Sequence, residues 1–214
     1  MLDSQSILFA LDILGTISFA ISGALVGIDK RADLLGVILL ACTTGVGGGT
    51  LRDVFLGNLP PSVFNKPIHV PLCIITAVVV FCFARVFKDH YEENSLKVRM
   101  INNVFDAIGL GVFSAGGARV AIEAGLGGNW GAVVFMAMVT GAGGGLLRDV
   151  MINQVPMVLT RRIYALAALV GGGTYYVLRQ YMDSAAASFI ATAVVFAIRM
   201  LATKYHWNLP RAIE

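Results

Sequence analysis

Charged residues are scarce in this sequence of 214 residues. Asp, Glu, Lys and Arg together make up 14% of the chain, whereas hydrophobic residues make up 57%. A soluble domain of this size carries roughly a quarter charged residues. The apolar excess must therefore face a medium other than water, and a lipid bilayer is the expected medium. The net charge of +3 is too small to indicate a nucleic-acid partner.

Cysteine and histidine are also sparse. Cys42, Cys73 and Cys82 lie in apolar runs without a CxxC spacing, and the three histidines are scattered. This pattern argues against a disulfide framework and against a zinc site. The sequence also lacks the GxSxG, HExxH, Walker and Rossmann signatures. We therefore expect no enzymatic activity and no cofactor.

Long apolar runs are abundant, and seven of them approach the roughly 20 residues that a helix needs to cross a bilayer. They cover about Ile7–Ile28, Leu34–Leu56, Val70–Phe87, Ile101–Ile122, Trp130–Ile152, Ile163–Tyr181 and Ala185–Tyr205. The connections between them are short and polar. We therefore expect an all-α membrane protein with seven transmembrane helices and one membrane domain.

The second and fifth segments contain nearly the same motif. Residues 44–54 read TGVGGGTLRDV, and residues 140–150 read TGAGGGLLRDV, at an offset of 96. The first and fourth segments match at an offset of 94. There Asp12 corresponds to Asp106, Gly15 to Gly109, Phe19 to Phe113 and Gly23 to Gly117. This many ordered identities predict an internal duplication.

Each half of this duplication holds three spans. Because three is an odd number, the second half must enter the membrane from the opposite side. The prediction is a 3+3 inverted repeat plus one helix, an architecture whose ion or substrate path commonly lies between the halves near the midplane. We expect residues 1–90 to form the first repeat, 100–183 to form the second, and 184–214 to form the seventh helix and a cytoplasmic tail.

Three consecutive glycines occur in each of the matched second and fifth helices. A glycine inside a helix costs about 1 kcal/mol relative to alanine, and interrupted helices at matched positions of two halves indicate a transport site. We therefore expect both helices to be broken there and to border a pore. The alternative is close helix packing through small residues. The glycines in question are Gly47, Gly48, Gly49, Gly143, Gly144 and Gly145.

An Arg-Asp pair follows each glycine run inside the apolar segment, as Arg52-Asp53 and as Arg148-Asp149. A charge within the bilayer costs at least a few kcal/mol, so it faces the bundle or water and needs a partner. Neighbouring helical positions point about 100° apart. We therefore expect pairing between the halves, of Arg52 with Asp149 and of Arg148 with Asp53. These charges either line a pore or clamp the two helices together.

Polar residues recur on one face of the first and fourth helices and beside the glycine runs. Asp12 and Asp106 either draw cations into a narrow wet path or accept hydrogen bonds from the exposed amides of a broken helix. Thr44 and Thr140 either coordinate an ion or bond back to their own helix. The polar candidates for a pore lining are Asp12, Thr16, Ser22, Thr44, Asp106 and Thr140.

The doubled GGGxxRD motif, in a seven-span chain of this length, resembles the prokaryotic TRIC (trimeric intracellular cation) channel family. The resemblance covers essentially the whole chain. It implies a homotrimer in membrane lipid, with one pore per subunit for K⁺ and, less selectively, Na⁺, and no other metal. It also implies that the second and fifth helices kink at the glycines. The same domain has been described as a glycine transporter, so a secondary transporter of a small amino acid is the alternative.

Lysine and arginine are distributed unevenly between the loops, and this bias sets the orientation of a membrane protein. With the N-terminus outside, only Lys66 and Arg179 fall outside. Eleven residues then fall inside, namely Lys30, Arg31, Arg85, Lys88, Lys97, Arg99, Arg161, Arg162, Arg199, Lys204 and Arg211. We expect an inner (plasma) membrane protein with its N-terminus outside and its C-terminus in the cytoplasm.

Reporter fusions test this orientation. A reporter joined after Glu214 should be active only if it is a type that functions in the cytoplasm, because the basic loops are retained on that side. The same reporter in a format that functions only outside the cytoplasm should stay silent. Activity of the outside format at Glu214 would contradict the predicted orientation.

Overall fold

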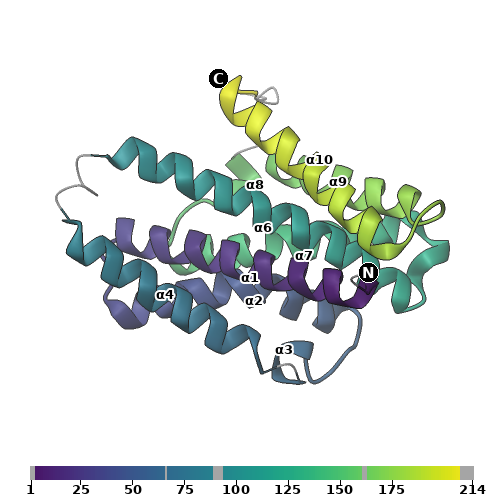
Figure 1. Cartoon of the computed structure of the whole chain (residues 1–214), viewed down its shortest axis with the longest axis horizontal. Coiled ribbons are helices and arrows are strands. Elements are labelled where there is room, and N and C mark those ends of the chain that lie inside the picture. The colour runs from purple at the N-terminus through teal and green to yellow at the C-terminus, as the bar shows by residue number, and fades with distance from the viewer. Residues whose placement is uncertain (1–2, 66, 89–93, 161–162, 208–214) are drawn as a thin grey trace.

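The computed structural model describes residues 3–65, 67–88, 94–160 and 163–207, which form helices and no strand (Figure 1). The seven long helices are α1 (Ser4–Asp29), α2 (Leu34–Phe55), α4 (His69–Val86), α6 (Ser95–Glu123), α7 (Trp130–Met151), α9 (Ile163–Leu178) and α10 (Ser184–Lys204). The short helices are α3 (Ser62–Asn65), η1 (Leu126–Gly128) and α8 (Met157–Thr160). The predicted all-α class and the seven long helices are confirmed.

Six of these helices are long and apolar enough to cross a membrane, and α9, with 16 residues, is a shorter apolar helix. Many large apolar side chains point outward, away from the bundle. On α4, for example, Val79 is 61% exposed and Phe83 is 65% exposed. Such a surface is stable in lipid and costly in water. The chain is a multi-pass membrane protein.

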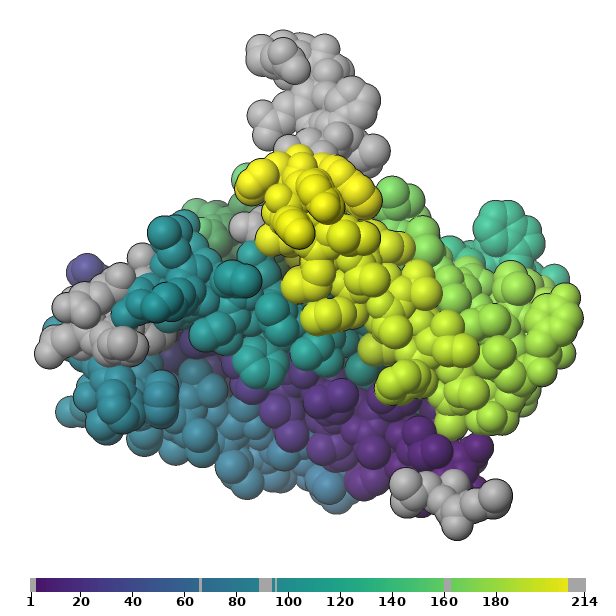
Figure 2. Space-filling view, turned by 45° about the horizontal axis from the view of Figure 1, so that its top comes forward, coloured from purple at the N-terminus to yellow at the C-terminus, as the bar shows by residue number. Residues whose placement is uncertain are grey.

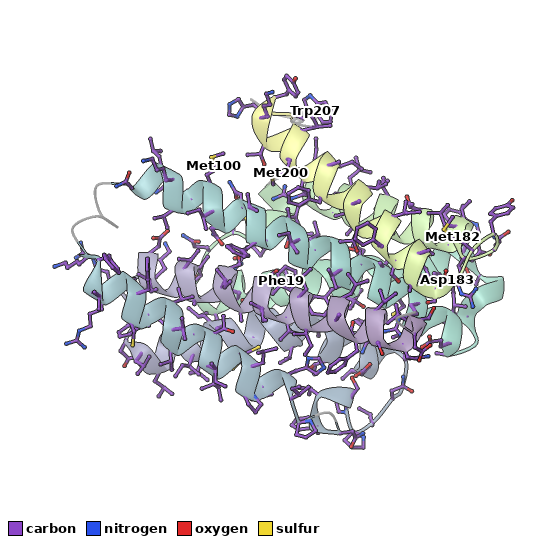
Figure 3. The ribbon with its side chains drawn as sticks, viewed as in Figure 1. Phe19, Met100, Met182, Asp183, Met200 and Trp207 are labelled. Atoms are coloured by element: carbon purple, nitrogen blue, oxygen red, sulfur yellow. The ribbon has the colours of Figure 1, made fainter. Side chains whose placement is uncertain are left out.

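The two repeats pack against each other along equivalent helices. α1 packs on α6, and α2 packs on α7. The rings of Phe19 and its counterpart Phe113 stack with centroids 5.4 Å apart, near the middle of the bundle (Figure 3). Ser22 of α1 contacts Asp106 of α6, whereas Asp12 contacts Arg119. Residues that come later in α1 therefore contact residues that come earlier in α6. The two equivalent helices thus run antiparallel, as an inverted repeat requires.

The duplication extends to the turns that end the helices. The backbone is left-handed at Arg31 (φ 56°) after α1, and at its counterpart Gly125 (φ 90°) after α6. It is also left-handed at Gly57 (φ 72°) after α2, and at Asn153 (φ 53°) after α7. A left-handed residue just past the last turn is a common way to end a helix. The seventh long helix, α10, lies outside the repeat and packs on α6 and α9 (Figure 2).

The glycine runs do not interrupt their helices, contrary to the break expected from helix propensity. α2 continues through Gly47–Gly49 and α7 continues through Gly143–Gly145. A Cβ atom on Gly48 would collide with the carbonyl oxygen of Thr140, and one on Gly144 would collide with the carbonyl oxygen of Thr44. The glycines therefore allow two backbones to cross in contact, which is the small-residue packing alternative. Packing at the crossing offsets their poor helix propensity.

An alanine substitution at the crossing tests this role. Gly48→Ala should lower the free energy of unfolding by about 1–3 kcal/mol, the usual cost of an overpacked core. Thermal unfolding of the detergent-solubilised protein measures the change. Gly173 is the matched control, because a Cβ there meets no atom within 4 Å. Gly173→Ala should be neutral or stabilising, and equal losses in both variants would remove the argument for a close crossing.

Candidate functional site

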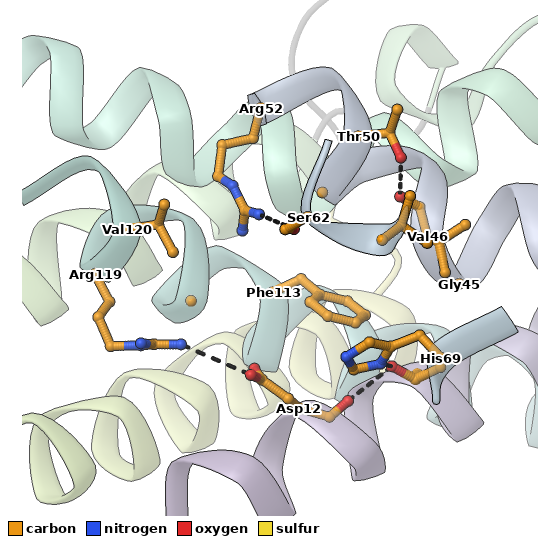
Figure 4. A pocket seen from close by; sticks show the side chains of 14 residues that line it. Asp12, Gly45, Val46, Thr50, Arg52, Ser62, His69, Phe113, Arg119 and Val120 are labelled. Carbon is orange, nitrogen blue, oxygen red and sulfur yellow. Dashed lines mark hydrogen bonds and ion pairs between the residues drawn. The ribbon is translucent and has the colours of Figure 1, made fainter. Parts of the chain in front are cut away.

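Two polar cavities lie at opposite ends of α1 and α6. The first cavity, of about 90 Å³, is bordered by α1, α2, α3, α4 and α6, and has Asp12, Arg52 and His69 among its lining residues (Figure 4). The second cavity, of about 450 Å³, has Arg148 and Asp149 in its lining. Both volumes are large enough for several water molecules. The repeat relates the cavities, since Arg52 of the first corresponds to Arg148 of the second.

The first cavity brings together residues from five helices. Arg119 of α6 lies 3.7 Å from a carboxylate oxygen of Asp12 and 3.3 Å from one of Glu123. The Thr16 hydroxyl donates a hydrogen bond to the Asp12 carbonyl (2.8 Å), and the Nδ1 atom of His69 lies 3.1 Å from the same hydroxyl oxygen. The Thr16 hydroxyl and the His69 ring are therefore hydrogen-bonded, and the tautomer of the ring decides which of them is the donor.

The two Arg-Asp pairs form within each half, not between the halves. Arg52 donates to Oδ1 of Asp53 from Nε (2.9 Å) and from Nη2 (2.7 Å). The other carboxylate oxygen, Oδ2, accepts a hydrogen bond from the backbone N–H of Ser62 (2.8 Å), at the start of α3. In α7, Arg148 donates to Asp149 (2.9 Å), whose second oxygen accepts from the backbone N–H of Met157 (2.8 Å), at the start of α8.

The predicted pairing of Arg52 with Asp149 and of Arg148 with Asp53 is therefore wrong. Adjacent helical positions point about 100° apart, but the arginine side chain is long enough to fold back onto the next carboxylate. The loops that follow the helices supply free amides, which use the remaining carboxylate oxygen. Each pair thus fixes the turn that follows its own helix.

A neutral cluster of buried charges surrounds Asp106, which is only 1% exposed. Its carboxylate lies 3.6 Å from Arg148 and 3.8 Å from Arg199 of α10. Ser22 accepts a hydrogen bond from Arg148 (3.0 Å), and the Tyr164 hydroxyl donates to Asp106 (3.4 Å). With Asp149, the cluster has two positive and two negative charges. This balance limits the cost of keeping ions away from water.

The equivalent carboxylates Asp12 and Asp106 have different surroundings. Asp12 has a side chain that is 27% exposed and lines the first cavity, whereas the side chain of Asp106 is 2% exposed and lies behind two arginines. Of these two acidic candidates, only Asp12 is open to a cavity. The cause is sequence divergence between the repeats and the addition of Arg199 from α10.

The threonines beside the glycine runs bond back to their own helices. The hydroxyl of Thr44 donates to the carbonyl of Leu40 (2.6 Å), and that of Thr140 donates to the carbonyl of Met136 (2.7 Å). Both threonines are buried. This is the second of the two alternatives expected for them, and it leaves their hydroxyl hydrogens engaged within the helix.

All three cysteines are free. Within the ranges that the structure describes, no group of three or more His, Cys, Asp or Glu side chains has the arrangement of a metal site.

Comparison with known proteins identifies the family. A family model described as glycine transporter matches the chain twice, over residues 9–85 and 103–180. The UPF0126 inner membrane protein YadS of Escherichia coli K12 is 35% identical over 208 residues, which are 95% of each chain. The UPF0126 membrane protein of Deinococcus radiodurans is 35% identical over 202 residues, which are 94% of this chain and 89% of the relative.

Solved structures match over the same length. A structure described as a prokaryotic TRIC channel in 0.5 M KCl is 37% identical, with a TM-score of 0.86, and the match covers 96% of this chain and all of the other. The chain belongs to the TRIC channel family. A TRIC orthologue from Rhodobacter sphaeroides is 32% identical, with a TM-score of 0.83 and coverage of 95% and 100%.

Some residues that contact the predicted site residues were not themselves predicted from the sequence. Ser62 bonds to Asp53 through its backbone, and His69 reaches Thr16 across 53 positions, so neither has a local signal. Arg199 did have a signal. It is a charge within an otherwise apolar helix, and such residues face the bundle and find partners. Its position in the seventh helix, outside the repeat, gave it no counterpart for comparison.

The local pairing makes a quantitative prediction. A double-mutant cycle with Arg148→Gln and Asp149→Asn should give a coupling energy of about 0.5–3 kcal/mol in the free energy of unfolding, as expected for residues in contact. The control cycle combines Arg52→Gln with Asp149→Asn, which belong to different pairs. That cycle should be additive within about 0.5 kcal/mol. A larger coupling energy in the control cycle would support the pairing of Arg52 with Asp149 between the halves.

Proposed function

We propose that the chain is a homotrimeric cation channel in which each subunit has its own pore for K⁺ and also Na⁺. The observation that carries this proposal is the pair of repeat-related polar cavities at opposite ends of α1 and α6. They approach the α2–α7 crossing from its two sides. Relatives support the same function, since one similar structure is described in terms of conductance through TRIC cation channels.

The charges around the two cavities suit the passage of a cation. Arg52 and Arg148 would each repel a cation, but Asp53 and Asp149 neutralise them at 2.7 Å and 2.8 Å. Beside the first cavity, Arg119 lies between Asp12 and Glu123, and these three side chains leave one net negative charge that attracts cations. Ser22 and the cluster around Asp106 form the narrow part that a cation must pass. Gly47–Gly49 and Gly143–Gly145 border this path at the crossing.

The channel would lie in the inner (plasma) membrane, with its N-terminus outside and its C-terminus in the cytoplasm. The eleven-to-two distribution of Lys and Arg supports this orientation, and the E. coli relative is named an inner membrane protein. Residues 1–90 and 100–183 would act as the two repeats, and 184–214 as the added helix and tail. The two family matches, each within one of these ranges, support this division.

A secondary transporter of a small amino acid such as glycine is the alternative, and the description of the matching family model favours it. The two functions differ in their kinetics. A channel gives single-channel currents in planar bilayers, with a reversal potential that follows the K⁺ gradient. A transporter gives saturable glycine uptake into liposomes that depends on a coupling gradient.

A substitution that fills the first cavity tests the proposed pore. Gly116 lines this cavity, and a Cβ on it meets no atom within 4 Å. Gly116→Leu should therefore fold normally while its side chain fills much of the 90 Å³ space, and most of the K⁺ current in planar bilayers should disappear.

Gly173→Leu is the matched control, because it also has open space but lies on α9, away from both cavities. It should keep the wild-type current, and light scattering should give the mass of a trimer for both variants. Full K⁺ current in Gly116→Leu would exclude the first cavity from the pore.

A further inference from the structure

A third cavity lies beside the second one, with which it shares Asn103, where the C-terminal end of α10 meets the beginnings of α6 and α9. Its volume is about 350 Å³, within the range of ~300–1,000 Å³ that is usual for small-ligand sites. Arg199, Thr203, His206 and Trp207 line it from α10 and the residues that follow, and Ile163 lines it from α9. None of its described lining residues is Asp or Glu.

Arg199 lines this cavity, and two of its buried hydrogen-bond donors lack an acceptor. The residue is 3% exposed, and its Nε and Nη2 atoms have no hydrogen-bond partner among the described residues. The nearest carboxylate, Asp106, is 3.8 Å away, too far for a hydrogen bond. The guanidinium group stacks on an aromatic ring, since its central carbon lies 4.8 Å from the centroid of the Tyr164 ring. The unpaired N–H groups at its edge suit a phosphate, which arginine binds with two parallel hydrogen bonds.

The start of α9 adds a second feature that favours an anion. Ile163 is the first residue of α9 that the structure describes, and it lines the cavity. The helix dipole makes the N-terminal end of a helix positive. This end of α9 therefore favours an anion in the cavity, in addition to the charge of Arg199.

The aromatic residues at the end of α10 give the depth of the cavity in the bilayer. Trp207 and Tyr205 stack with centroids 6.2 Å apart and are 48% and 57% exposed. Trp207 lies at the far end of α10 (Figure 3). Such rings favour the headgroup layer, so the cavity lies where lipid phosphates are found. We propose that this cavity binds a phosphate group, carried by an anionic phospholipid or free in solution.

Trp207 provides the readout. The chain has two tryptophans, so Trp130→Phe leaves Trp207 as the only one. The intact purified protein in this background is titrated with short-chain phosphatidylglycerol, with short-chain phosphatidylcholine and with inorganic phosphate. Phosphatidylglycerol should change the Trp207 emission with saturation, and phosphatidylcholine should not, because its choline places a positive charge beside Arg199.

Variants identify the binding groups. Arg199→Gln should weaken binding about tenfold or more, the loss expected for one charge-assisted hydrogen bond, and Arg199→Lys should restore part of it. Arg179→Gln, at the opposite end of α9, is the matched control and should bind as the parent does. Because Arg199 also contacts Asp106, Thr203→Phe provides a second test. It fills the cavity without changing any charge, and it should abolish binding.

The ligands separate the two sources of phosphate. Binding of both phosphatidylglycerol and inorganic phosphate supports recognition of the phosphate group itself. Binding of the lipid alone assigns the site to a headgroup, and binding of inorganic phosphate alone assigns it to a soluble anion. Three outcomes overturn the proposal: no saturable change with either ligand, equal binding of phosphatidylcholine, or unchanged affinity in Thr203→Phe. None of these readouts depends on ion conduction, so a failure here is distinct from a failure of the channel proposal.

Discussion

The contact between the backbones of α2 and α7 is the constraint on which the rest of the structure depends. Two helices can approach this closely only where no side chain lies between them. Gly48 of α2 faces the backbone of α7, and Gly144 of α7 faces the backbone of α2. The crossing sets how far apart the two repeats lie. That separation determines where α1 meets α6, and hence where the two cavities form. Substitution at the crossing would therefore affect parts of the molecule that do not touch it.

The buried charges follow from the same arrangement. Each Arg-Asp pair stands at the end of a helix that has just left the crossing, and each carboxylate holds the first amide of the next short helix. The charges thus order the turn between two spans and contribute a polar wall to a cavity. α10 changes this symmetric plan by adding Arg199 to the cluster around Asp106. The seventh helix therefore makes the two ends of the molecule electrically different.

Much of this fold follows from sequence patterns, because the apolar runs and the duplicated motif are strong and local. The spans of α2 and α7 were expected within a few residues of their observed bounds. The continuity of both helices through their glycine runs was not expected, because the low helix propensity of glycine is a weak preference that tertiary packing overrides. The partners of Arg52 and Arg148 were missed because a long side chain can reach a neighbour that the helical angle disfavours. The contact of His69 with Thr16 depends on how α4 enters the bundle, and nothing near either residue indicates it.

The antiparallel contact of equivalent helices also limits how the two copies of a duplicated gene segment can evolve. Where two equivalent helices cross, each residue meets the helix that carries its own counterpart. The residues of the pairs Thr44 and Thr140, Gly48 and Gly144, and Phe19 and Phe113 are identical. A change there in one copy needs an accommodating change in the other. Away from these crossings the two copies differ, so that Thr16 corresponds to Leu110 and Arg119 to Leu25. These residues at the crossings are thus the same in both copies, whereas Thr16 and Arg119, at the first cavity, differ from their counterparts.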